Sequence, residues 1–320
     1  MNPIIHVSNL VKRYKSAQVN AVDGISFHVA PGEFFVLLGP NGAGKTTTIS
    51  ILTTTLSPTS GHVEIAGHDL VRDANGVRES VGIIFQQPSL DQNLTAEENV
   101  RLHAVLYGLY PFRPAYWLMP RGYKQQVSEL AEILGIANEI HKPIKTFSGG
   151  MKRKLEIIRS LIHHPRVLFL DEPTTGLDPL SRRSLWDYLT RVRAEKETTI
   201  FLTTHYLEEA EQADTISILH HGKIVAQGTP DEVKAHLVEN YLLVDAADHD
   251  ALRQELRARR IPFVETPLFK IELNGNSPHK LLKQIDTPLT TVKINTPSVE
   301  DAYLAIIQEH DDDNSTASAH

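Results

Sequence analysis

Apolar runs, polar turns and segments of helical periodicity alternate along the central part of the chain. Between the strand-like runs, residues 151–162 and 185–192 place apolar side chains on one face at helical period. Strands that alternate with helices predict a mainly parallel sheet covered by helices. Four runs have the length and composition of buried strands: residues 34–38, 81–85, 167–170 and 198–204.

The two ends of the chain follow other patterns. Residues 4–30 alternate loosely between apolar and polar positions, which predicts two antiparallel strands joined by a polar turn. From about Tyr241, short strand patterns and short helical patterns follow one another. Residues 299–309 then form a last amphipathic helix. This change of pattern indicates a separate, smaller α+β domain.

These patterns divide the chain into three predicted parts. Residues 1–235 form an α/β domain, within which a mainly helical part covers about residues 90–165. Residues 236–310 form the small α+β domain. Residues 311–320 are polar and acidic, which favours a disordered tail.

Composition and charge narrow the class of protein. The chain has 320 residues and no cysteine, which excludes disulfides, thiolate metal sites and a cysteine nucleophile. No apolar run approaches the roughly 18 residues that span a bilayer, and the first residues lack a secretory pattern. We therefore expect a cytosolic protein or one held peripherally on a membrane by a partner. The formal net charge of −7 argues against a nucleic-acid partner.

A glycine-rich loop joins the strand at 34–38 to the helical run at 47–56. Its pattern G-x-x-x-x-G-K-[ST] is that of a phosphate-binding loop, in which backbone N–H groups and the following helix N-terminus cradle an anion. In this pattern the lysine reaches the outer phosphates and the first threonine ligates Mg²⁺. The predicted phosphate loop consists of Gly39, Pro40, Asn41, Gly42, Ala43, Gly44, Lys45, Thr46 and Thr47.

Polar side chains follow three of the predicted strands. Asp171 can hold Mg²⁺, and the adjacent Glu172 can orient and deprotonate water. Gln86 and His205 follow two other strands, and ligands bind at this carboxyl edge in open α/β sheets. The amide of Gln86 can ligate Mg²⁺ or water, and the imidazole of His205 can hydrogen-bond a terminal phosphate.

A second anion site is predicted about a hundred residues after the first. Ser148 suits the N-cap of a helix, and Gly149 and Gly150 leave its first turn uncovered. One phosphate could use both helix N-termini. The residues alone leave open whether the second one acts on the nucleotide of its own chain.

Taken in order, these motifs resemble those of an ATP-binding cassette (ABC) transporter ATPase. The resemblance covers about residues 4–235, and the motifs occur in the family's sequence order. They are similar to the Walker A, Q-loop, signature, Walker B, D-loop and H-loop motifs, at residues 39–47, Gln86, 147–151, 167–172, 176–178 and His205 respectively.

The resemblance implies a fold, a dimer and roles for particular residues. The implied fold is an α/β P-loop NTPase cassette with a RecA-like core, an antiparallel β subdomain and an α-helical signature subdomain, followed here by the small α+β domain. Two subunits, expected to be identical, enclose two ATP molecules so that the signature of one faces the Walker A of the other. Tyr14 then matches the aromatic residue that stacks on adenine, and Asp178 links the two sites across the dimer.

In the implied mechanism, ATP binding closes the dimer and hydrolysis reopens it. The loop amides and Lys45 hold the phosphates, and Glu172 acts as general base while His205 positions the γ-phosphate and water. Mg²⁺ is organised by Thr46, Gln86 and Asp171. The partner is a separate transmembrane permease subunit, so the chain belongs at the cytoplasmic face of the membrane.

Two departures from the usual signature indicate a branch of the family. Met151 stands where glutamine is usual, and Phe147 replaces leucine. Together with Lys152 and Arg153, Met151 resembles the daunorubicin-resistance-like branch that exports drugs, lipids or polysaccharides. The ending at residues 296–304 is similar to that of the same branch. The cargo is left undetermined, since its contacts belong to the membrane subunit.

Other classes of ATPase remain as alternatives. A soluble cassette ATPase acting on ribosomes normally has two cassettes in one chain, and this chain has one Walker A and one signature. A chromosome-type ATPase contains long heptad runs, which do not occur here. A non-catalytic subunit is disfavoured by Glu172 and His205.

An unusual segment interrupts the predicted helical part. Residues 110–120 contain three prolines and four aromatic residues, so we expect a non-helical loop. It either packs on itself or contacts the transmembrane partner.

Overall fold

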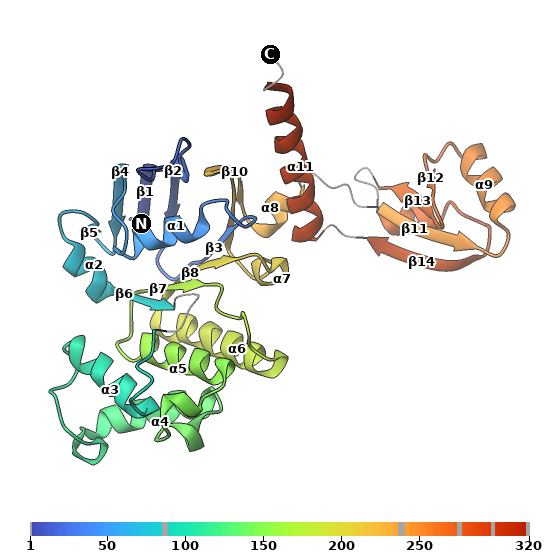
Figure 1. Ribbon diagram of the computed structural model, residues 1–320. Coiled ribbons are helices and arrows are strands. Elements are labelled where there is room, and N and C mark those ends of the chain that lie inside the picture. The colour runs from blue at the N-terminus through green and yellow to red at the C-terminus, as the bar shows by residue number, and fades with distance from the viewer. Residues whose placement is uncertain (1, 85–88, 236–240, 274–276, 296–297, 318–320) are drawn as a thin grey trace. The chain divides into compact units, whose positions relative to one another are not determined.

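The computed structural model describes residues 2–84, 89–235, 241–273, 277–295 and 298–317 (Figure 1). The chain divides into two compact units, Met1–Gln227 and Gly228–His320. The sequence pattern predicts this boundary after residue 235. The boundary lies earlier because helix α8 (Pro230–Ala235) packs against helix α11 (Val299–Ala317) within the second unit.

The first unit is organised around a six-stranded sheet with the strand order β10-β9-β3-β8-β7-β6. Strand β3 pairs in parallel with both β8 and β9, and β6, β7 and β8 continue the parallel pairing. The mainly parallel sheet that the sequence predicted is therefore confirmed. The strands are β3 (Phe34–Leu38), β6 (Val81–Ile84), β7 (Val167–Asp171), β8 (Thr199–Thr204), β9 (Thr215–His220) and β10 (Lys223–Gly228).

A smaller antiparallel sheet packs against the six-stranded sheet in the core of the first unit. Its order is β2-β1-β4-β5, formed by β1 (Ile5–Lys12), β2 (Val22–Val29), β4 (Ser60–Ile65) and β5 (His68–Asp69). Aromatic rings join the two sheets: Phe27 stacks on Phe35 at 5.2 Å between centroids, and Phe35 stacks on Phe201 at 5.1 Å. This buried stack fixes the start of β3, the strand that leads into the glycine-rich loop.

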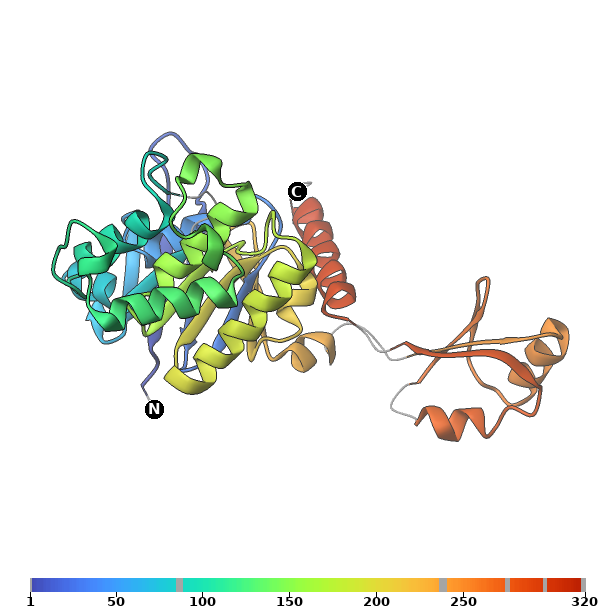
Figure 2. The same cartoon turned by 90° about the horizontal axis from the view of Figure 1, so that it is seen from below.

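Helices cover both faces of the parallel sheet. Helix α1 (Lys45–Leu52) lies on the side of the antiparallel sheet, whereas α5 (Gly149–Leu161) and α6 (Pro179–Lys196) lie on the opposite face (Figures 1 and 2). Beyond them are α3 (Ala96–Leu106) and α4 (Arg121–Ile133). The remaining helices of this unit are α2 (Ala74–Ser80), α7 (Leu207–Ala210) and three 3₁₀ turns, Tyr116–Leu118, Ala137–Glu139 and Ile144–Thr146.

Helix α3 begins with a capping box formed by Thr95 and Glu98. The Thr95 hydroxyl accepts a hydrogen bond from the Glu98 amide, and the Glu98 carboxylate accepts one from the Thr95 amide at 2.8 Å. This capping box satisfies two backbone donors that a helix N-terminus would leave without partners.

The segment at residues 110–120 combines buried and exposed aromatic residues. The rings of Tyr110 and Tyr116 pack edge-on against buried Tyr123, with centroids 5.5 and 6.4 Å away. In contrast, the side chains of Phe112 and Trp117 are 65% and 76% exposed. The segment is non-helical except for the 3₁₀ turn, as predicted. One set of its side chains therefore packs against α4, and another set is presented to solvent.

The second unit contains an antiparallel sheet, β12-β13-β11-β14. Its apolar core includes Leu242 and Val244 from β11, Leu252 and Leu256 from α9, and Phe269 from β13. The α+β character expected from the sequence is present. The remaining elements are β11 (Tyr241–Ala246), α9 (His249–Ala258), β12 (Val264–Glu265), β13 (Phe269–Glu272), α10 (Pro278–Leu282) and β14 (Leu289–Asn295).

The C-terminal end differs from the expected disordered tail. Helix α11 continues to Ala317, so residues 311–317 are helical, and residues 318–320 lie outside the described part of the chain. The helix is nucleated upstream, where Asp301 and Ser298 exchange hydrogen bonds at its first turn. Once a helix is nucleated, each further residue adds at small cost even without an apolar face. No helix among the described residues is long and apolar enough to cross a membrane.

Candidate nucleotide-binding site

The glycine-rich loop requires glycine at two of its positions for lack of space. A Cβ atom on Gly39 would lie 2.3 Å from the carbonyl oxygen of Leu219, and one on Gly44 would lie 2.4 Å from that of Ala21. Gly44 also has φ = 111°, the left-handed region that favours glycine. Because no side chain caps α1, the amides of its first turn remain directed at the loop. The loop thus has the geometry of an anion cradle.

Lys45 lies inside this loop and bonds to its backbone. Its ammonium donates hydrogen bonds to the carbonyl oxygens of Gly39 at 2.6 Å and Pro40 at 3.0 Å. Burial lowers the pKa of Lys45, and the negative charges of Glu172 and Asp171 oppose that shift. A phosphate entering the loop can therefore take over an ammonium that is already oriented. The loop encloses a cavity of about 200 Å³ lined by Ala21, Asn41, Gly42, Gly44, Lys45, Thr46, Thr47 and Glu172.

Asp171 is the last residue of β7, and its side chain is buried. Burial raises the pKa of its carboxyl, while a hydrogen bond from the Thr203 hydroxyl lowers it. Thr203 lies directly opposite on β8. Thr203 is not among the site residues predicted from the sequence, although two threonines just before His205 at a strand end are a visible signal.

Glu172 has a strained backbone conformation and a partner that orients its carboxylate. Its φ angle is 47°, which is uncommon for a residue with a side chain, and its amide donates to the Thr203 carbonyl at 3.0 Å. The Nδ1 atom of His205 lies 3.0 Å from Oε1 of Glu172. When Nδ1 carries the proton, it donates to the carboxylate and holds it at the edge of the cavity. The structure thus brings together the predicted base and the predicted histidine.

Two further residues predicted at the site are Tyr14 and Gln86. Tyr14 lies in the turn between β1 and β2, its hydroxyl is 3.3 Å from the Thr47 hydroxyl, and its side chain is 44% exposed. Its partly exposed ring therefore lies beside the end of the phosphate loop, with the Lys12 ammonium 5.7 Å from the ring centroid. Gln86 lies outside the described residues.

The predicted second anion site has a different local geometry. The Ser148 hydroxyl accepts a hydrogen bond from the Met151 amide at 3.3 Å, which confirms the N-cap of α5. A Cβ atom on Gly149 would meet no other atom within 4 Å, so the first turn of α5 is uncovered there, whereas one on Gly150 would lie 3.6 Å from the carbonyl oxygen of Gly176. None of the residues at 148–150 is among those that line the phosphate-loop cavity of the described chain.

Asp178 acts locally as the N-cap of α6. Its carboxylate accepts hydrogen bonds from the hydroxyl of Ser181 and from its amide at 2.9 Å. These two bonds lower the pKa of Asp178, the hydroxyl contributing most. The carboxylate is therefore charged, and it fixes the turn at residues 176–178 before α6.

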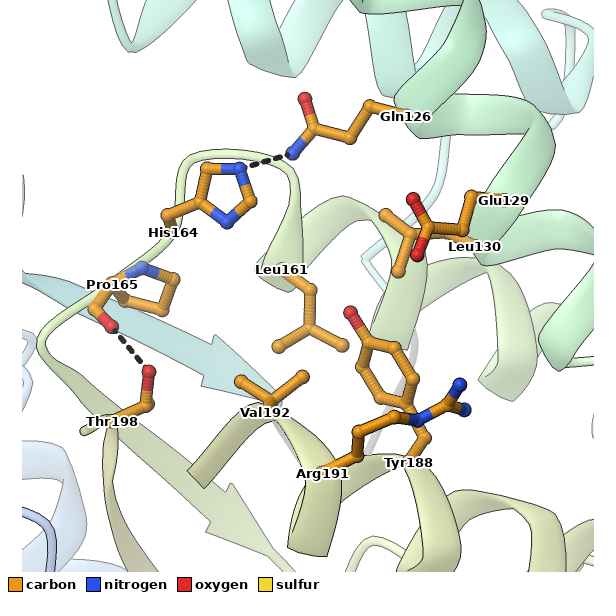
Figure 3. Close-up of a pocket in the computed structure, with 10 residues that line it drawn as sticks. All are labelled: Gln126, Glu129, Leu130, Leu161, His164, Pro165, Tyr188, Arg191, Val192 and Thr198. Atoms are coloured by element: carbon orange, nitrogen blue, oxygen red, sulfur yellow. Dashed lines mark hydrogen bonds between the residues drawn. The ribbon is translucent and has the colours of Figure 1, made fainter. Parts of the chain in front are cut away.

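A separate pocket lies between α4, the turn after α5 and α6 (Figure 3). It has a volume of about 180 Å³, and the Gln126 amide projects across it to donate to Nε2 of His164 at 3.0 Å. Tyr188 and Arg191 form its opposite wall on α6. It contains none of the residues that the sequence analysis assigned to the nucleotide.

The comparisons with known proteins identify the family. Residues 22–175 match the family described as ABC transporter. The chain is 35% identical to the daunorubicin/doxorubicin resistance ATP-binding protein DrrA of Streptomyces peucetius, over 98% of this chain and 96% of that protein. The chain belongs to the ATP-binding cassette ATPases of ABC transporters. The predicted family and its drug-resistance branch are thereby confirmed.

Other relatives and solved structures agree. This ABC ATPase is 40% identical to the Nod factor export ATP-binding protein I of Ralstonia nicotianae, over 73% of this chain and 70% of that protein. An ATP-binding subunit of an ABC transporter has a TM-score of 0.65 and 31% identity, and covers 72% of this chain and 92% of its own. A dimeric bacterial ABC transporter cassette has a TM-score of 0.63 and 26% identity, and covers 70% of this chain and 98% of its own. The predicted cassette fold and ATPase activity are therefore confirmed.

Proposed function

We propose that this ABC ATPase works as a dimer whose ATP binding and hydrolysis drive export of a drug, lipid or glycan through a separate transmembrane subunit. One observation carries the dimer: the Lys45 loop and the Glu172 carboxylate line one cavity, while the N-terminus of α5 lies outside that cavity. A second copy is the simplest source of Ser148, Gly149 and Gly150 for the first copy's phosphate. The existence of a dimeric cassette with the same fold supports this arrangement.

The residues around Lys45 suit a magnesium–ATP complex. The Thr46 hydroxyl, the Asp171 carboxylate and the amide of Gln86 offer the oxygen ligands that Mg²⁺ prefers. When bound, Mg²⁺ would neutralise part of the charge on the phosphates. The pairing of Asp171 with the Thr203 hydroxyl limits the ways in which the carboxylate can turn, so its oxygens are aimed before nucleotide arrives.

Hydrolysis requires a base, and Glu172 is placed for that task. His205 holds one carboxylate oxygen, so Glu172 can accept a proton from water attacking the γ-phosphate. His205 also reaches toward the phosphate and positions the water. Tyr14 stacks on the adenine, and Asp178 links the turn before α6 to the second site across the dimer.

The export role rests on relatives and on one surface. DrrA is named for drug resistance and the Ralstonia relative for Nod factor export. The exposed side chains of Phe112 and Trp117 offer a contact for the transmembrane subunit, which would hold the chain at the cytoplasmic face of the membrane. The second unit, Gly228–His320, then acts as an accessory to the cassette formed by the first unit.

The dimer is tested by measuring mass in solution with ATP and Mg²⁺. The Glu172→Gln variant retains nucleotide, so light scattering should show an ATP-dependent dimer. Glu208→Gln, the same change at an exposed residue of α7, should remain able to turn over ATP and relax to the monomer. A Glu172→Gln protein that binds ATP and remains a monomer at every protein concentration would contradict the proposal. The transmembrane partner is tested by co-purification with a multispan membrane protein.

A further inference from the structure

Helix α5 carries three charged residues on its inner face, and the catalytic roles above use none of them. Arg153, Glu156 and Arg159 are spaced by three residues, so they share one face of the helix. The side chains of Arg153 and Glu156 are 4% and 1% exposed, and that of Arg159 is 14% exposed. The Glu156 carboxylate forms ion pairs with both arginines: its Oε2 lies 3.4 Å from Nη1 of Arg153, and its Oε1 lies 3.5 Å from Nη2 of Arg159. We call these three residues the α5 ladder.

One end of the α5 ladder holds the end of the catalytic strand. The Nη2 atom of Arg153 donates to the carbonyl oxygens of Asp171 and Glu172, each at 3.0 Å. Its Nε atom donates to the carbonyl oxygen of Pro173, also at 3.0 Å. A single planar guanidinium thus fixes three consecutive carbonyls. Lysine could not reproduce this because its ammonium is a point donor.

The backbone that Arg153 holds is the strained one. Glu172 has φ = 47°, and such a conformation persists only where surrounding bonds over-determine it. The Glu172 amide is held by the Thr203 carbonyl, and the Glu172 carbonyl is held by Arg153. Both sides of this residue are therefore fixed, and the direction of its carboxylate depends on both.

The other end of the α5 ladder holds the segment that follows Gln86. Glu156 accepts a hydrogen bond from the Ser89 amide at 2.6 Å. Arg159 donates to the carbonyl oxygen and to the hydroxyl of Ser89, each at 2.7 Å. Helix α5 therefore forms hydrogen bonds with the end of β7 and with Ser89, which lies three residues after Gln86. Its N-terminus is capped by Ser148.

We propose that Arg153 is a positioning residue for ATP hydrolysis, which sets the direction of the Glu172 carboxylate through the backbone of residues 171–173. Glu156 and Arg159 extend this control to Ser89. This inference rests on the proposed role of Glu172 as general base.

The variants Arg153→Met and Arg153→Lys test this role. Either change should lower kcat by about 10–100-fold, since a base displaced by about 1 Å loses activity on that scale. The dissociation constant for ATP should change by less than about 3-fold, because Arg153 does not line the phosphate cavity. Arg101→Met is the matched control: Arg101 is also buried and also paired with a glutamate on its own helix, at Glu97. It should lower the melting temperature to a similar extent and leave kcat nearly unchanged.

A double-variant cycle separates positioning from general destabilisation. If Arg153 acts through Glu172, then Arg153→Met in a Glu172→Gln background should slow single-turnover hydrolysis by less than about 3-fold further. A full additional 10–100-fold loss in that background would overturn the proposal, as would a kcat for Arg153→Met equal to that of Arg101→Met. Glu172→Gln alone reports on the base itself, so failure of that assignment is visible separately. Should Arg153→Met fold poorly, Arg153→Lys provides the same comparison with the charge retained.

Discussion

The two helix N-termini that face phosphate in this proposal are built differently. At α1 the residue before the helix is left-handed Gly44, no side chain caps the first turn, and Lys45 and Glu172 line the same cavity. At α5 the hydroxyl of Ser148 caps the first turn, and no acidic or basic side chain closes over Gly149. The N-terminus of α1 is enclosed by side chains of its own chain, and the N-terminus of α5 is capped by Ser148 and exposed on the surface at Gly149. The difference assigns binding and chemistry to α1 and completion of the site to α5.

The largest expected effect concerns the hydrolytic groups, which all lie at the α1 end. Glu172→Gln removes the base while preserving the shape of the side chain, so the rate of ATP hydrolysis should fall by ~10²–10⁴-fold. Phosphate release measured under ATP saturation checks this. Glu208→Gln is the control, and its rate should equal that of the unmodified chain. Hydrolysis by Glu172→Gln at the normal rate would place the base elsewhere and remove the contrast between the two ends.

The second expected effect concerns affinity. Lys45→Met removes the ammonium that the loop orients, and hydrogen bonds to charged groups contribute about 1.5–3 kcal/mol. The dissociation constant for ATP should therefore rise by about 10–100-fold, as measured by equilibrium binding of a fluorescent ATP analogue. Lys280→Met, at an exposed position on α10, should bind as tightly as the unmodified chain. Unchanged affinity in Lys45→Met would mean that the cavity does not bind the phosphates.

The opposite behaviour is expected at α5. Ser148→Ala should leave the ATP affinity of the isolated chain within about 2-fold, and should lower steady-state hydrolysis by about 10-fold because one donor to the phosphate is lost. Loss of the cap should also reduce the free energy of unfolding by about 1 kcal/mol. Thr95→Ala removes a cap from α3 and controls for that loss.

Mixing two defective chains sharpens the same test. A dimer of Lys45→Met with Ser148→Ala contains one site with an intact loop from one chain and an intact α5 end from the other. The mixture should hydrolyse ATP faster than the average of the two variants measured alone. A mixture that shows only that average would indicate that each chain completes its own site.

Sequence and structure contributed different parts of this picture. The phosphate loop, the carboxylates after β7 and the Ser148 cap were predictable because each depends on residues close together in sequence, where spacing fixes geometry. The hydrogen bonds from Arg153 to the carbonyl oxygens of residues 171–173 were not predictable. They join segments about twenty residues apart through backbone atoms, which no side-chain pattern reveals. The same holds for the left-handed backbone of Glu172.

The segment at residues 110–120 and the C-terminal helix also could not be fully predicted from composition. The aromatic content of residues 110–120 predicted a loop, but only the packing of Tyr110 and Tyr116 on Tyr123 shows which rings are buried. The polar composition after residue 310 suggested disorder, whereas α11 continues because its first turn is capped well upstream. Composition describes the preferences of a segment, and contacts outside that segment decide which one is realised.

The smallest expected effect is a shift in the pH dependence at the α1 end. Burial raises the pKa of the Asp171 carboxyl above its ordinary value, and the Thr203 hydroxyl opposes this by bonding to the charged form. Since Mg²⁺ requires the carboxylate, activity should decline as the pH falls through this raised pKa, at a higher pH than an exposed aspartate would give. Thr203→Val removes the opposing bond, so the decline should move to still higher pH.

The controls for this prediction use the same substitution and the same metal. Thr198→Val replaces another buried threonine hydroxyl, one that donates to the Pro165 carbonyl, and should leave the pH profile of hydrolysis unchanged. Raising the Mg²⁺ concentration should move the decline to lower pH in every variant, because metal binding and protonation compete for the Asp171 carboxylate. A decline in Thr203→Val that stays in place or moves to lower pH would show that another group sets the acid limit. In that case protonation of Asp171 would not limit activity, and the division of labour between the two helix ends would rest on Lys45 and Glu172 alone.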